Sequence, residues 1–220
     1  MNPSTESAAL PARQREVWDQ IDSACVRQGH GLGWRLLTCP WANFQRAEVA
    51  LMTLNPGGSS YEPPSLSVEA GSAYVIEGWL GRDPGSSPLQ RQVQRLCAII
   101  GVDPAEVLSG YLVPFRSPTW AKLDRSRHAL EFGVTLWRDL FRDWRPHLTF
   151  TISEVAFQAM HQILKAGPVS HVPSGWGKVS IRTADYDGGR LVGLPHLSRF
   201  QLFGGDEGRE EVAIRAMRVE

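Results

Sequence analysis

Apolar residues recur every three or four positions in parts of this chain, as they do along the buried face of an amphipathic helix. Val17, Ile21 and Cys25 follow this spacing. A second segment follows it with Leu89, Val93, Leu96 and Ile100, and Gly101 ends that segment as a helix C-cap would. A further helix is expected to begin at Asp103, because a proline follows it and a glutamate stands three positions later. The other helices are predicted over residues 11–28, 89–100, 125–144 and 154–165.

Short apolar runs lie between these helices and predict buried strands. The runs are residues 48–54, 111–113, 147–152, 179–182 and 191–194. Strands that alternate with helices predict an α/β fold, here a three-layer α/β/α sandwich around a mostly parallel sheet. Ligands bind beyond the carboxyl ends of such strands. The Gly- and Pro-rich segments after Leu54, Val113 and Leu194 are therefore expected to converge on one pocket.

The composition fits a single domain over residues 1–220, with residues 1–10 expected to be flexible. With 42% hydrophobic and 21% charged residues, a packed core is expected. The 23 basic and 23 acidic residues cancel, so any contact with nucleic acid must come from a local basic patch. No apolar run could cross a membrane and no signal peptide is recognisable, so we expect a cytoplasmic monomer that does not bind membranes.

The three cysteines do not indicate a metal or cluster site. Cys25, Cys39 and Cys97 are odd in number and far apart in the sequence, so they form no Cys-x-x-Cys pair. Three thiolates also fall short of a four-cysteine cluster or zinc site. We expect buried, reduced thiols and no metal or cofactor.

Two polar segments follow predicted strands and carry candidate chemistry. In the first, Asn55-Pro56-Gly57-Gly58, the glycines let the backbone approach a ligand closely, and the Asn55 side-chain carbonyl can hold a water. In the second, which begins at Pro195-His196, the imidazole can donate a hydrogen bond to charge that develops on a departing group. Taken alone, the first segment is more typical of an ordinary strand-ending turn and the second of a structural histidine.

Together the two segments resemble the signature motifs of the uracil-DNA glycosylase superfamily. Residues 54–60 are similar to the Asn-Pro-Gly motif of its mismatch-specific uracil/thymine branch. His196-Leu197-Ser198 is similar to the His-Pro-Ser of other branches, with leucine in place of proline. An alternative alignment places residues 197–199 on the Leu-Ser-Arg of the mismatch branch. Order and strand context agree over residues 45–205, although clear identity is confined to the motifs.

The resemblance implies a monofunctional DNA glycosylase that hydrolyses the N-glycosidic bond of a flipped-out damaged or modified base and leaves an abasic site. Asn55 would position the attacking water, and His196 would donate to the base. The two residues are expected at the ends of adjacent parallel strands. Base contacts are assigned to Gly57, Tyr61 and Tyr111. DNA contacts are assigned to Arg116, Ser198, Arg199 and a wedge, which is Phe200 or, in the other alignment, Leu197.

One departure bears on the substrate. Many members of the superfamily read uracil with an asparagine on the middle strand, where this chain has Tyr111. A phenol cannot supply the paired donor and acceptor of an amide, so a modified pyrimidine is expected in place of uracil. Glu69 and Glu77 are expected to be solvated, although either could accept from an exocyclic amine if it lined the pocket.

Alternatives remain open at the level of sequence. A superfamily member could bind DNA or a nucleotide without cleaving it. An unrelated α/β hydrolase or nucleotide-binding protein is disfavoured, because the chain has no P-loop, GxGxxG or GxSxG motif. The sequence does not distinguish repair from defence against foreign modified DNA.

Overall fold

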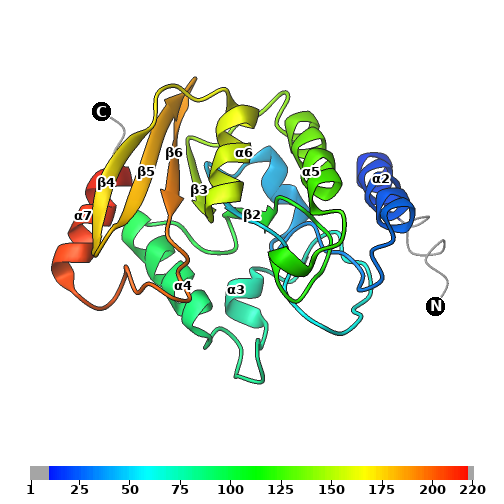
Figure 1. Ribbon diagram of the computed structural model, residues 1–220, viewed down its shortest axis with the longest axis horizontal. Helices are drawn as coiled ribbons and strands as arrows, with labels where there is room; N and C mark the ends of the chain where they lie inside the picture. The colour runs from blue at the N-terminus through cyan, green and yellow to red at the C-terminus, as the bar shows by residue number, and fades with distance from the viewer. Residues whose placement is uncertain (1–9, 218–220) are drawn as a thin grey trace.

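The computed structural model describes residues 10–217 and has a six-stranded sheet with the strand order β2-β1-β3-β6-β5-β4 (Figure 1). The strands are β1 (Val49–Thr53), β2 (Leu108–Tyr111), β3 (Leu148–Ile152), β4 (Ser170–Trp176), β5 (Val179–Tyr186) and β6 (Gly189–Leu194). Strands β2, β1, β3 and β6 are parallel, whereas β5 and β4 extend the sheet antiparallel. The predicted α/β fold with a mostly parallel sheet is confirmed.

Helices cover both faces of the sheet (Figure 1). They are α2 (Ala12–Gln28), α3 (Ala73–Ile76), α4 (Pro88–Ile100), α5 (Ser126–Leu140), α6 (Glu154–Leu164) and α7 (Glu207–Met217). Two 3-10 turns, Trp41–Gln45 and Trp120–Lys122, lie between them.

The core has two parts because successive strand side chains point to opposite faces. On β1, Ala50 and Met52 pack with α2, α5 and α6 in one cluster, whereas Val49 and Leu51 pack with α4 and α7 in the other. All five residues of β1 are buried, which explains its continuous apolar run.

Several predicted boundaries were wrong. No helix begins at Asp103; its carboxylate accepts from the Ala105 amide at 2.8 Å, but only a turn forms before β2 begins at Leu108. Strand β2 therefore ends at Tyr111, where the sequence predicted that a strand begins. Helix α5 ends at Leu140, four residues before the predicted end. Of residues 1–10, only Leu10 lies within the described residues, so the expectation of flexibility falls outside them.

The cysteines are buried and free, as expected. Burial raises the pKa of the Cys25 and Cys39 thiols to about 11 and that of Cys97 to about 12, so all three are protonated near neutral pH. Within residues 10–217 no helix has the length and apolar character needed to cross a membrane.

Candidate active site

The two motif residues lie at the same level of the sheet. Thr53 of β1, Ile152 of β3 and Leu194 of β6 are in register, and Asn55 and His196 each stand two residues past their strand end. The strands are not adjacent as predicted, because β3 lies between them. Neighbouring strands are about 4.8 Å apart, so β1 and β6 are separated by about 10 Å.

The orientation of the Asn55 side chain is fixed by its amide nitrogen. Nδ2 donates to the Ser117 hydroxyl at 2.9 Å and to the backbone carbonyls of Pro56 and Phe115 at 3.2 and 3.4 Å. Only the NH₂ end can donate to carbonyls, so Oδ1 must point the other way. Among residues 10–217 we find no hydrogen bond to Oδ1. This oxygen can therefore accept a hydrogen bond from a water.

Two of the three acceptors for Asn55, on Phe115 and Ser117, come from the segment after β2, which runs alongside the Asn-Pro-Gly segment. The Val113 amide donates to the Leu54 carbonyl at 2.8 Å, and the Ser117 amide donates to the Pro56 carbonyl at 3.1 Å. The Ser117 side chain is buried, and its hydroxyl donates to the Thr119 carbonyl at 2.9 Å. Ser117 is thus held as an acceptor for Asn55.

Arg116 braces the same loop. Its guanidinium donates to the Gly57 carbonyl and forms an ion pair with Glu62. Gly58, at φ +130°, accommodates this side chain, because a Cβ there would lie 2.9 Å from Arg116 Nη1. Arg116 is only 8% exposed, so its assignment to a DNA contact at the rim of the cleft was wrong. The loop after β2 turns it inward, toward the motif.

Gly57 and Tyr61 present the outer side of this loop. A Cβ built at Gly57 meets no atom within 4 Å, and its φ is not left-handed, so the protein itself does not require glycine there. Tyr61 is 63% exposed although it is a large aromatic residue. Both positions are open to a ligand.

Tyr111 is the last residue of β2 and lies beside β1, the strand that leads to Asn55. It is also close to two ion pairs, Arg35–Glu77 and Arg116–Glu62. It is paired with Thr53 across β1 and β2. Burial raises the pKa of its hydroxyl, and the nearby positive charges of Arg35 and Arg116 offset this only in part. Tyr111 is therefore a neutral phenol that can donate one hydrogen bond and accept others.

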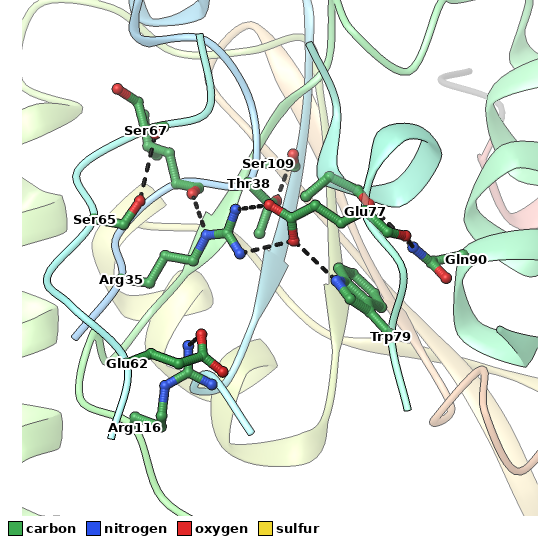
Figure 2. Close-up of polar contacts among 12 residues, drawn as sticks. Arg35, Thr38, Glu62, Ser65, Ser67, Glu77, Trp79, Gln90, Ser109 and Arg116 are labelled. Carbon is green, nitrogen blue, oxygen red and sulfur yellow. Dashed lines mark hydrogen bonds and ion pairs between the residues drawn. The ribbon is translucent and has the colours of Figure 1, made fainter. Parts of the chain in front are cut away.

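Sequence reasoning missed the pair formed by Arg35 and Glu77, which is shown in Figure 2. Both terminal nitrogens of Arg35 donate to the Glu77 carboxylate, and the Trp79 indole donates to it at 2.9 Å. The Arg35 Nε donates to the Leu37 carbonyl at 3.1 Å. The Gln90 side-chain amide anchors the segment through the Glu77 backbone carbonyl at 2.7 Å. The two residues are 42 positions apart in the sequence and belong to no motif, so no local sequence pattern predicted that they would pair.

The charge of Glu77 is stabilised at this position. Burial alone would raise its pKa, but hydrogen bonds from Arg35 and Trp79 and the charges of Arg35 and Arg116 outweigh that effect and hold it below the ordinary value. The expectation that Glu77 is simply solvated was wrong. Glu69 is exposed and accepts from the Ser67 hydroxyl and, at 3.1 Å, from the Trp41 amide.

His196 stands in a tight turn after β6. Its backbone carbonyl accepts from the Arg199 and Phe200 amides at 2.8 and 3.0 Å, and Ser198 Oγ lies 2.7 Å from Nδ1. Desolvation and the charge of Arg199 lower the pKa of the imidazole below its ordinary value. The ring is therefore neutral near pH 7, and a Ser198 hydroxyl that donates to Nδ1 leaves Nε2 to carry the proton.

The two candidate wedge residues, Leu197 and Phe200, lie in different surroundings within this turn. Leu197 is 2% exposed and packs in the core with α4 and α7, so its side chain is not presented to DNA as the alternative alignment required. Phe200 is half-buried, with its ring edge-on to Trp176 at 6.0 Å. Ser198 and Arg199 are exposed, in agreement with a surface role.

A cavity of about 370 Å³ lies beside His196. Its other polar walls come from the N-terminus of α6 and from strands β4 and β5, with Ser153, Glu154, His171, Ser180 and Arg182. Phe200 also lines the cavity. His171 was missed because β4 was not predicted.

The structure thus gathers the predicted residues into two groups on either side of the end of β3. Asn55, Gly57, Tyr111 and Arg116 form one group, and residues 196–200 form the other. Compared with known protein families and with curated proteins, the chain finds no match.

Proposed function

We propose that this protein is a monofunctional DNA glycosylase that excises a modified pyrimidine. The observation that carries the proposal is the fixed amide of Asn55. Its Nδ2 is held by three acceptors, its Oδ1 is free to bind a water, and His196 stands at the same level of the sheet two strands away. A water acceptor and a hydrogen-bond donor on opposite sides of one nucleotide suit hydrolysis of the bond between them.

In the proposed reaction the target nucleotide is flipped out, because neither C1′ nor the base can be reached inside a duplex. The C1′–N bond breaks, and its electron pair leaves with the base. His196 Nε2–H donates to an oxygen of the departing base, a contribution of about 3 kcal/mol for an oriented donor. The water held by Asn55 Oδ1 adds to C1′ and loses its proton to solvent.

Neutral His196 suits this role. Desolvation and the charge of Arg199 lower the imidazole pKa, so this site disfavours a positively charged ring. A neutral imidazole can still stabilise the developing anion by donating a hydrogen bond to it. Arg199 is exposed beside it and supplies a cation for a neighbouring DNA phosphate.

The proposed preference for a modified pyrimidine is based on Tyr111 and its neighbours. One phenol cannot match the adjacent acceptor and donor on the edge of uracil, and an unpaired polar group costs about 1–3 kcal/mol. Glu77 is ionised and retains acceptor capacity beyond its bonds from Arg35 and Trp79. A carboxylate accepts from an exocyclic amine, which cytosine derivatives carry and uracil lacks.

The test is incubation with single- and double-stranded oligonucleotides that each contain one altered base, followed by alkaline cleavage at abasic sites. We expect cleavage at modified cytosines in preference to uracil, and reduced discrimination in Tyr111→Asn. Efficient release of uracil with modified cytosines untouched would refute the base preference and leave base release intact. Tight DNA binding without abasic sites in any substrate would instead make the protein a DNA-binding member without activity.

A further inference from the structure

A second groove of about 1310 Å³ lies between α2 and α5, which run side by side in Figure 1. Six cationic side chains line it, against three acidic ones, Glu16, Asp19 and Asp139. The cations are Arg13, Arg27, Arg138, Arg142, Arg145 and Lys165. This is a local excess of positive charge in a chain whose net charge is zero.

Part of this charge is already neutralised within the groove. Arg13 pairs with Glu16 at 2.8 Å and with Asp139 at 2.7 Å, and Arg142 also pairs with Asp139. The other four cations form no ion pair within residues 10–217; they are Arg27, Arg138, Arg145 and Lys165. All but Arg145 are exposed, and Arg145 is half-buried. Their charges are available to a partner.

The cation-rich end of the groove is distant from the candidate active site. Helix α6 begins directly after β3, so its C-cap, Lys165, lies back at the amino ends of the parallel strands. Arg145 just precedes β3, and Arg138 lies in the last turn of α5, which leads to that same edge. Asn55 and His196 lie at the opposite edge, at the carboxyl ends of β1 and β6.

The choice of a polyanion rests on the charge of the groove. Among its apolar lining residues, Leu136, Phe141 and Ile163 are 3%, 2% and 4% exposed, and Phe132 is half-buried. An amphipathic protein helix needs accessible apolar surface for binding, whereas a polyanion needs only cations. Guanidinium groups, which make up five of the six cations, match the geometry of phosphate oxygens.

We propose that this groove binds the sugar–phosphate backbone of DNA as a second contact, remote from the site of base release. The choice of DNA among polyanions rests on the proposed function. The groove itself is argued from charge, exposure and position. It would hold a duplex without reading its sequence, because phosphate contacts carry no base information.

The test measures affinity for an unmodified duplex at salt concentrations from roughly 50 to 200 mM, with Arg138→Gln, Lys165→Gln and the double variant. Each lost phosphate contact is expected to reduce the slope of log K against log salt by about 0.9. Raising the salt over that range should therefore weaken DNA binding by the double variant roughly tenfold less than it weakens binding by the wild type. Arg91→Gln is the matched control, since Arg91 is exposed on α4, on the other face of the sheet. Arg91→Gln should leave the slope of log K against log salt the same as in the wild type.

Equal slopes for the groove variants and wild type, or an equal change in Arg91→Gln, would overturn the proposal. Binding of an acidic polypeptide that depends on Arg138 and Lys165, with DNA affinity unaffected by either, would also overturn it and identify a protein partner. Base release is assayed in parallel on a single-stranded oligonucleotide. A groove-dependent salt slope without any base release would refute the proposed function and support the groove.

Discussion

The Asn55 amide nitrogen donates to the buried Ser117 hydroxyl at 2.9 Å, a contact between the loops that follow two neighbouring strands. The hydroxyl in turn donates to the Thr119 carbonyl, so its lone pair faces Asn55. Ser117 therefore positions Asn55 without itself reaching the reacting atoms.

The first prediction follows from this contact. Ser117→Ala is expected to lower kcat about tenfold, the equivalent of a net hydrogen bond of about 1.4 kcal/mol, with little change in KM. Ser117→Thr keeps the hydroxyl and should restore most of the rate. A threonine variant as slow as the alanine variant would contradict a positioning role for the hydroxyl.

A second prediction separates two neighbouring glycines. Gly57→Ala meets no atom of the protein and should leave the melting temperature unchanged or slightly higher, yet lower base release because the methyl group faces the ligand. Gly58→Ala should lower the melting temperature, because Gly58 has φ +130° and a Cβ there approaches Arg116. Full activity in a stably folded Gly57→Ala would exclude close approach of the substrate at this loop.

The third prediction concerns pH. Since the pKa of His196 is lowered, the neutral ring dominates at pH 7, and base release by a neutral donor should stay level as pH rises further. Donation by an imidazolium would instead make the rate fall about tenfold per pH unit above the pKa. Arg199→Gln removes a nearby positive charge and should raise the His196 pKa, measured by NMR titration of the imidazole.

The same shift affects stability. A pKa that is lower in the folded protein than in the unfolded chain stabilises the fold at pH values above the unfolded pKa. That contribution is lost as pH falls through the folded pKa. Melting temperatures measured from pH 7 downward should therefore fall less steeply in His196→Gln than in wild type.

A fourth prediction distinguishes the two aligned wedges. Phe200→Ala should reduce activity on duplex DNA more than on single strands, because only the duplex must be opened. Leu197→Ala removes a core side chain and should cost about 2–5 kcal/mol of stability. Selective loss of duplex activity in a stably folded Leu197→Ala would reverse this assignment.

Much of the sheet could be predicted from the sequence because the parallel strands β1, β3 and β6 are short apolar runs. The same logic located Asn55 and His196, since the chain direction alone places strand ends at one edge of the sheet. Strand β4 was missed because it is an edge strand with Pro173 and mostly solvent-accessible positions. Helix α7 buries only Ala213, Ala216 and Met217 and gives a weak periodic signal.

The tertiary contacts of the site could not be predicted. Arg35 and Glu77 come from segments far apart in the sequence. The Ala73 amide at the start of α3 donates to the Thr38 carbonyl near Arg35, and Gln90 of α4 holds the Glu77 carbonyl. Arg116 looked like a rim cation next to the middle strand, but the left-handed Gly58 leaves space for it to turn inward. Side-chain direction in loops depends on such contacts and not on residue type.

The central claim is that Asn55 acts on the water in the bond-breaking step. The most direct measurement is single-turnover base release by Asn55→Ala, together with its affinity for the same oligonucleotide. We predict a loss of rate of at least roughly a hundredfold with affinity unchanged, because the held water matters only as the bond breaks. Unchanged base release in Asn55→Ala, or an equal loss of affinity and rate, would contradict the account.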